Sequence, residues 1–144
     1  MAIINTNVRP SDLATLLGAI APQSASGVVS SAWIDASRFH AFEAIVLAGT
    51  LGAGATVDAK LRQATDASGT GAKDITGKAI SQVTASNRQA LINLRPEELD
   101  VAGGFRYVQL QITVGVAASQ VAGLVQGFGA RYGPAAHMAN TEVK

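Results

Sequence analysis

The sequence contains no cysteine, and this absence removes several kinds of chemistry at once. Disulfide frameworks, thiolate nucleophiles and cysteine-ligated zinc or iron–sulfur sites are all excluded. A transition-metal site also has little to draw on, because the only histidines are His40 and His137. His40 and Glu43 lie three positions apart on an expected strand, so they point to opposite faces. We therefore expect neither a metal nor a cofactor.

Charge is scarce as well. Charged residues make up 15% of the 144 residues, and the formal net charge is +1. No broad field would attract nucleic acid or an acidic membrane, and no apolar run approaches the roughly 20 residues that span a bilayer. Solvated faces must be covered mainly by Ser, Thr, Gln, Asn, Gly and Ala, which are easily desolvated against another protein. The composition therefore favours a protein partner.

Motifs for catalysis are missing too. The chain has no GxSxG elbow, and neither histidine stands in a triad order with a nucleophile. Glu97, Glu98 and Asp100 are close in sequence, but on a turn after Pro96 they suit capping or solvation better than an acid and base pair. We expect the protein not to be an enzyme. A small hydrolase on a β scaffold is an alternative, but the chain shows no set of catalytic residues for it.

Glycine, in contrast, is abundant, and the stretch ATDASGTGAKDITGKAIS over 64–81 looks at first like a phosphate-binding loop. A Walker-type loop needs four residues between its glycines, followed by Lys and then Ser or Thr. Here five residues separate Gly71 from Gly77, and Ala79 follows Lys78. The residues beyond alternate like a strand and not like a helix. The sequence therefore predicts a long connection between strands, in which glycine permits positive φ angles.

Most of the chain has the period of β-strands. The runs over 55–64 (ATVDAKLRQA), 105–117 (FRYVQLQITVGVA) and 120–133 alternate, and the run over 38–51 is apolar on both sides near its end, as a central strand would be. Gly and Pro clusters separate the runs, and no long helical period follows residue 25. Roughly eight short strands with turns between them predict an all-β fold, an antiparallel β-sandwich of jelly-roll-like type.

The N-terminal segment, residues 1–25, breaks this pattern. Between Pro10 and Pro22, four apolar residues have the spacing of a helical stripe, which predicts a short helix or an arm. These four are Leu13, Leu16, Leu17 and Ile20. The arm could pack on its own domain or reach onto a neighbouring subunit. We therefore divide the chain into this N-terminal arm or short helix, a β-sandwich domain (26–134) and a polar C-terminal tail (135–144).

Beyond these patterns, the sequence resembles a known family. The run from SSAWIDASRFHAFEAIVLAGTLGAGATVDAK through ALINLRPEELDVAGGFRYVQLQITV to the closing GFGARYGP is similar to head decoration, or cement, proteins of tailed bacteriophages. The likeness covers about residues 24–134 and is a pattern over many strands, with no single diagnostic motif. The N-terminal segment matches less well. Such proteins are small β-rich domains that sit outside the expanded shell, often as trimers, and clamp neighbouring subunits.

The resemblance implies a structural virion protein on the outer surface of the capsid, made in the host cytoplasm. Its expected partner is the major capsid protein, and its expected assembly is a homotrimer, with no nucleic acid, membrane or small-molecule substrate involved. We expect capsid contact in two regions, the N-terminal stripe and the loop over 66–78. The residues concerned are Leu13, Leu16, Leu17, Ile20, Asp66, Lys73 and Lys78.

Two other functions remain open at this point. One is a carbohydrate-binding β-sandwich module on the virion surface, which would need Trp33, Tyr107 and Tyr132 on one open face. The other is a different head or tail component, such as a connector or tail-tube protein. Those proteins usually form rings of six-fold or twelve-fold symmetry, so the number of copies in the oligomer separates them from a trimeric decoration protein.

Overall fold

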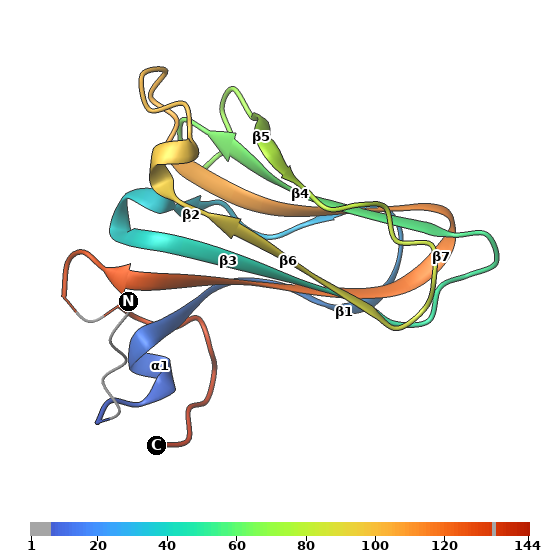
Figure 1. Ribbon diagram of the computed structural model, residues 1–144, viewed down its shortest axis with the longest axis horizontal. Coiled ribbons are helices and arrows are strands. Elements are labelled where there is room, and N and C mark those ends of the chain that lie inside the picture. Colours follow the sequence, from blue (N-terminus) through green and yellow to red (C-terminus); the bar gives the residue numbers. More distant parts are fainter. Residues whose placement is uncertain (1–6, 134) are drawn as a thin grey trace.

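The computed structural model describes residues 7–133 and 135–144. Its elements, in chain order, are α1 (Pro10–Leu13), β1 (Ala14–Ser30), β2 (Ile34–Asp35), η1 (Ala36–Arg38), β3 (Phe39–Ala48), β4 (Thr56–Ala64), β5 (Lys73–Ala79), β6 (Arg88–Leu94), η2 (Pro96–Glu98) and β7 (Tyr107–Ala130) (Figure 1). All strand pairs are antiparallel, so the predicted all-β, antiparallel fold class is confirmed. None of the helices in this part of the chain is long and apolar enough to cross a membrane.

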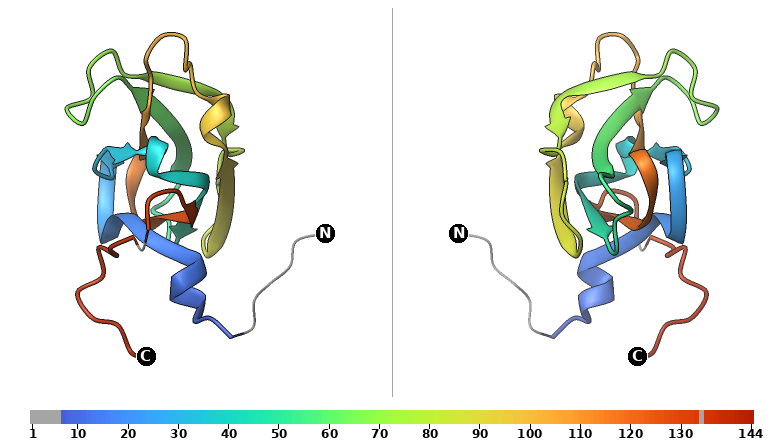
Figure 2. Two further views of the ribbon diagram at one scale, coloured as in Figure 1. Left: turned by 90° about the vertical axis from the view of Figure 1, so that its left-hand side faces the viewer. Right: turned by 90° about the vertical axis from the view of Figure 1, so that its right-hand side faces the viewer.

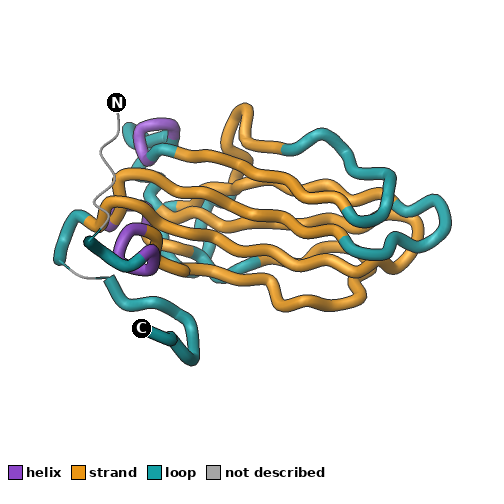
Figure 3. Tube along the Cα trace, turned by 60° about the horizontal axis from the view of Figure 1, so that its bottom comes forward, coloured by secondary structure: helices purple, strands orange, loops and turns teal. Residues whose placement is uncertain are grey.

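Strand β7 organises the fold, because it is 24 residues long and belongs to two layers. Its first half pairs with β4 on one side and with β2 and the end of β1 on the other. Its second half pairs with β3 and with the start of β1. We call β5-β4-β7-β1 the β4 layer and β6-β3-β7-β1 the β3 layer. The strands of the two layers run side by side along the length of the molecule (Figure 3).

The layers join where β7 and β1 bend together. In β7 the bend lies at residues 115–119 and includes Val116, which has φ of 72° and is 83% exposed. In β1 the register shifts between Ala25 and Gly27. Such irregularities let a strand turn sharply without ending. Two runs that alternation predicts as separate strands, 105–117 and 120–133, are therefore mostly the two halves of one strand, and the sheet curls into a nearly closed barrel (Figure 2).

The core lies between the layers and consists of their inward side chains. The first half of β7 contributes most of the stripe that its alternation predicts, namely Val108, Leu110, Ile112 and Val114. The alternation also predicts Val116 in this stripe, and that residue is exposed instead because the strand bends there. The β3 layer contributes Phe42, Ala44, Val46 and Val125, among others. Glycine leaves room for this packing at Gly123, where a Cβ would lie 2.7 Å from Leu110 Cδ2.

The N-terminal segment differs from its prediction. The helix is a single turn, and the sheet begins at Ala14 and not at residue 26, because β1 pairs with β7 over most of its length. The expected helical stripe is therefore split. Ile20 is buried and Leu17 packs against the core, whereas Leu13 is 43% exposed. Pro22 falls at a register shift of this edge strand, a position where proline is tolerated.

Candidate docking surface

Only the first half of the glycine-rich stretch, residues 65–72, is a connection between β4 and β5; the second half forms β5 itself, so the connection is shorter than predicted. Backbone N–H groups of this connection donate hydrogen bonds to the chain itself. Asp66 Oδ1 accepts hydrogen bonds from the backbone N–H groups of Thr70 at 3.1 Å and Ser68 at 2.9 Å. Hydrogen bonds from Thr70 and then Ser68 hold the pKa of Asp66 below its ordinary value. Gly69 lies against Trp33, where a Cβ would come within 2.6 Å of the indole Nε1. These donors are thus already used by a carboxylate of the chain.

The two lysines expected to contact the capsid are paired within the molecule. Lys73 Nζ lies 2.6 Å from Asp100 Oδ2 and 4.2 Å from the centroid of the Phe105 ring. Its hydrogen bond is the main cause that lowers the pKa of Asp100. Lys78 Nζ lies 3.0 Å from Glu98 Oε1. Both lysines therefore brace β5 against the connection between β6 and β7, and their contact with a capsid subunit stays a prediction.

The acidic residues after Pro96 support the same connection. Glu98 Oε2 accepts a hydrogen bond from the backbone N–H of Arg95 at 2.8 Å, and Asp100 Oδ1 accepts one from Gly103 at 3.0 Å. Within residues 7–133 and 135–144, no group of three or more His, Asp or Glu side chains could hold a metal ion. In Glu98 and Asp100, one carboxylate oxygen thus accepts from the backbone and the other binds a lysine of β5.

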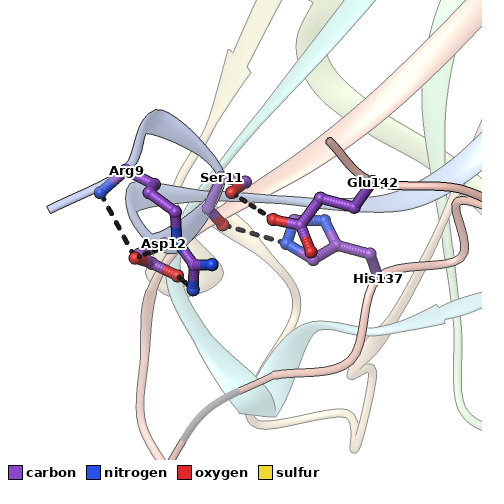
Figure 4. A network of polar contacts seen from close by, with 5 residues as sticks. All are labelled: Arg9, Ser11, Asp12, His137 and Glu142. Carbon is purple, nitrogen blue, oxygen red and sulfur yellow. Dashed lines mark hydrogen bonds and ion pairs between the residues drawn. The ribbon is translucent and has the colours of Figure 1, made fainter. Parts of the chain in front are cut away.

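The C-terminal tail is bound to α1 and to the start of β1 (Figure 4). The backbone N–H of Leu16 donates to His137 Nδ1 at 3.1 Å, and Met138 N–H donates to the carbonyl of Leu16 at 3.0 Å. His137 Nε2 lies 2.9 Å from the carbonyl of Ser11, so the tautomer with a proton on Nε2 satisfies both ring nitrogens. Ser11 Oγ also donates to Glu142 Oε1 at 2.6 Å. The tail therefore covers the free edge of β1 at Leu16.

Replacing His137 by alanine is expected to speed amide hydrogen exchange at Leu16 by about fivefold, because one hydrogen bond of about 1 kcal/mol is lost. Native-state exchange followed by NMR measures this rate. His40→Ala is the matched control, since the His40 side chain is exposed and makes no hydrogen bond within the described part of the chain. Equal exchange at Leu16 in the two variants would show that His137 does not hold the tail.

The β3 layer turns one face to the core and the other face outward. The strand register aligns the outward residues in four rows, which together we call the outer β3 face. Within each row the residues are given in the strand order β6, β3, β7, β1. The first row is Gln89, Leu47 and Ala122, without β1, and the second is Leu91, Ile45, Leu124 and Ala19. The third row is Asn93, Glu43, Gln126 and Leu16, and the fourth is Ala41, Phe128 and Ala14, without β6. One row is thus apolar across all four strands.

The outer β3 face is largely apolar and partly accessible. Leu91 is 58% exposed and Leu47 is 42% exposed, and the other apolar members of these rows are partly exposed. Glu43 is the one charged residue in the four rows. A hollow of about 440 Å³ lies at one end, lined in part by Leu47 and Pro22. A second, of about 480 Å³, includes Glu43 and Phe128 at the other end. Contiguous apolar surface of this kind is typical of interaction sites.

The aromatic residues of the carbohydrate alternative are arranged less favourably. The Trp33 indole is packed against Gly69, and the Arg106 guanidinium lies 5.3 Å from the centroid of the Tyr107 ring. Tyr132 is 79% exposed and lines a hollow beyond the end of β7. A sugar that stacked on the first two rings would first have to displace these contacts.

The comparisons with known proteins are distant. No protein-family model and no curated protein matches this sequence. Similar folds occur in chains from an empty virus-like particle of cowpea mosaic virus (12% identity, 95% of this chain and 90% of that chain, TM-score 0.46) and from broad bean stain virus (11%, 100% and 99%, TM-score 0.48). Another is in naturally occurring empty particles of cowpea mosaic virus (12%, 94% and 93%, TM-score 0.45). These values describe a similarity of shape and assign no function.

Proposed function

We propose that this protein is a head decoration protein of a tailed bacteriophage. In this role it is a non-enzymatic virion component that binds the outside of the shell and stabilises contacts between subunits of the major capsid protein. The observation that carries the proposal is the outer β3 face, a sheet surface with an apolar row across four strands and one charge. Such a face suits contact with another protein, because the burial of apolar surface away from water drives association. The sequence resemblance over about residues 24–134 supports the viral setting.

The energetic effect of such a protein on a capsid follows from mass action. A ligand that binds only the assembled shell stabilises it by about 2.7 kcal/mol when its free concentration is 100 times its Kd. If the protein binds as a homotrimer, the second and third contacts become intramolecular, so each single contact can be weak. A small rigid domain is sufficient for this task.

The test uses heads of the encoding phage that lack this protein. Purified protein is expected to bind expanded heads saturably, to occupy fixed positions on the outer shell by cryo-electron microscopy, and to raise the temperature at which the heads break. Heads of an unrelated phage serve as the control. Absence of binding to the cognate heads would contradict the proposal, and density confined to the portal vertex or the tail would identify a connector or tail-tube protein instead.

A further inference from the structure

We infer that the outer β3 face docks onto a different protein chain, whose matching surface is apolar and carries one Arg or Lys opposite Glu43. The identification of that chain as a shell subunit rests on the proposed function. The chemistry of the partner surface is argued from the residues of this chain alone.

The size of the face fits the central part of a stable interface. Neighbouring strands are spaced by about 4.8 Å, and neighbouring rows, two residues apart, by about 7 Å. Four strands and four rows therefore cover a planar area of roughly 500 Å². A standard protein interface buries about 800 Å² on each partner, with an apolar centre and a polar rim. The two hollows at the ends of the face would supply part of that rim, since they add Gln23 and Gln120 at one end and Arg95 at the other.

Glu43 determines the charge of the partner. It is half-buried, its neighbours in the row are Asn93 and Gln126, and it forms no ion pair within the described residues. Two cations line the same hollow: Lys78 is bonded to Glu98, and Arg95, which is exposed just after β6, forms no ion pair with Glu43. An apolar partner would remove water from the Glu43 carboxylate without compensation, and this desolvation is costly. A guanidinium or ammonium group placed opposite Glu43 would offset the cost and fix the register of the contact.

A second copy of this chain fits the face less well. Two copies packed through their apolar rows would bring two Glu43 carboxylates into one contact, and the four rows contain no cation. Arg95 lies beyond the rows, where it follows β6 and lines the hollow at the Glu43 end, and Arg88 pairs with the inward residue Ala48. Like charges desolvated together oppose association. We therefore assign the face to a different chain and leave any trimer contact to other surfaces.

The experiment measures binding to heads that lack the protein, by co-sedimentation. Leu91→Asp and Glu43→Lys are each expected to weaken binding on the order of 30-fold, the effect of losing one central contact of an interface. The matched controls are Val101→Asp and Glu97→Lys, which place the same new side chains on the exposed connections after β6. All four changes are at exposed or outward positions, so unaltered melting temperatures would verify folding.

The possible outcomes separate the inference from the proposed function. If wild-type protein binds heads and the Leu91 and Glu43 variants bind as tightly as the controls, the docking face is wrong and the proposed function stands. If wild-type protein does not bind heads, both are wrong. If Leu91→Asp instead converts an oligomer in solution into a monomer, the face joins copies of this chain, and the assignment to a different partner is overturned.

Discussion

Replacing Leu110 by alanine is expected to lower the free energy of unfolding by about 2–5 kcal/mol, the range for truncating a buried leucine. Leu110 has no exposed surface and lies in the middle of the inward stripe of β7. Its side chain reaches across the core toward Gly123, in the half of β7 that belongs to the β3 layer. Because the contact joins the two layers, a local side-chain shift cannot refill the space, and a cavity remains.

Urea denaturation of the two variants Leu110→Ala and Leu91→Ala measures this effect with a matched control. Leu91 is also a leucine on a strand of the sheet, but it is 58% exposed on the outer β3 face. Its truncation is expected to change the free energy of unfolding by less than about 0.5 kcal/mol. A loss at Leu91 as large as that at Leu110 would contradict an outward position and remove Leu91 from the docking surface.

The alternation of apolar residues made much of this fold predictable. In β7, the inward stripe from Val108 to Val114 and the polar residues between its members follow directly from a period of two. The run over 38–51 also held a signal for the docking surface. It is apolar on both sides near its end, and in the structure Val46 points into the core while Ile45 and Leu47 lie on the outer β3 face.

Contacts between distant segments could not be predicted in this way. The spacing of Leu13, Leu16, Leu17 and Ile20 fits a helix, but β1 pairs with residues roughly 80–110 positions further along the chain, and this pairing overrides the local preference. The bend at Val116 has a similar origin, since it depends on β7 serving two layers. The rows of the outer β3 face exist only through the register of four strands.

The second large effect is expected at Gly127, an inward position in the second half of β7. A Cβ there would lie 2.6 Å from Leu17 Cδ1 and 2.7 Å from the ring of Phe39. The Leu17 side chain can move, but Phe39 is 3% exposed and packs edge-on against Phe42 with ring centroids 5.8 Å apart. Gly127→Val is therefore expected to lower the free energy of unfolding by about 1–3 kcal/mol or more, the cost of overpacking a core.

Gln126→Val is the matched control, because it places the same side chain one residue earlier, on the outer β3 face. Its effect on the free energy of unfolding, measured by the same denaturation, is expected to stay within about 0.5 kcal/mol. A shift of one residue in the pairing of β7 would exchange the two faces of the strand. If Gly127→Val were as stable as wild type and Gln126→Val were destabilised, the register would be wrong. The four rows that bring Leu91, Leu124 and Glu43 onto one surface would then no longer exist.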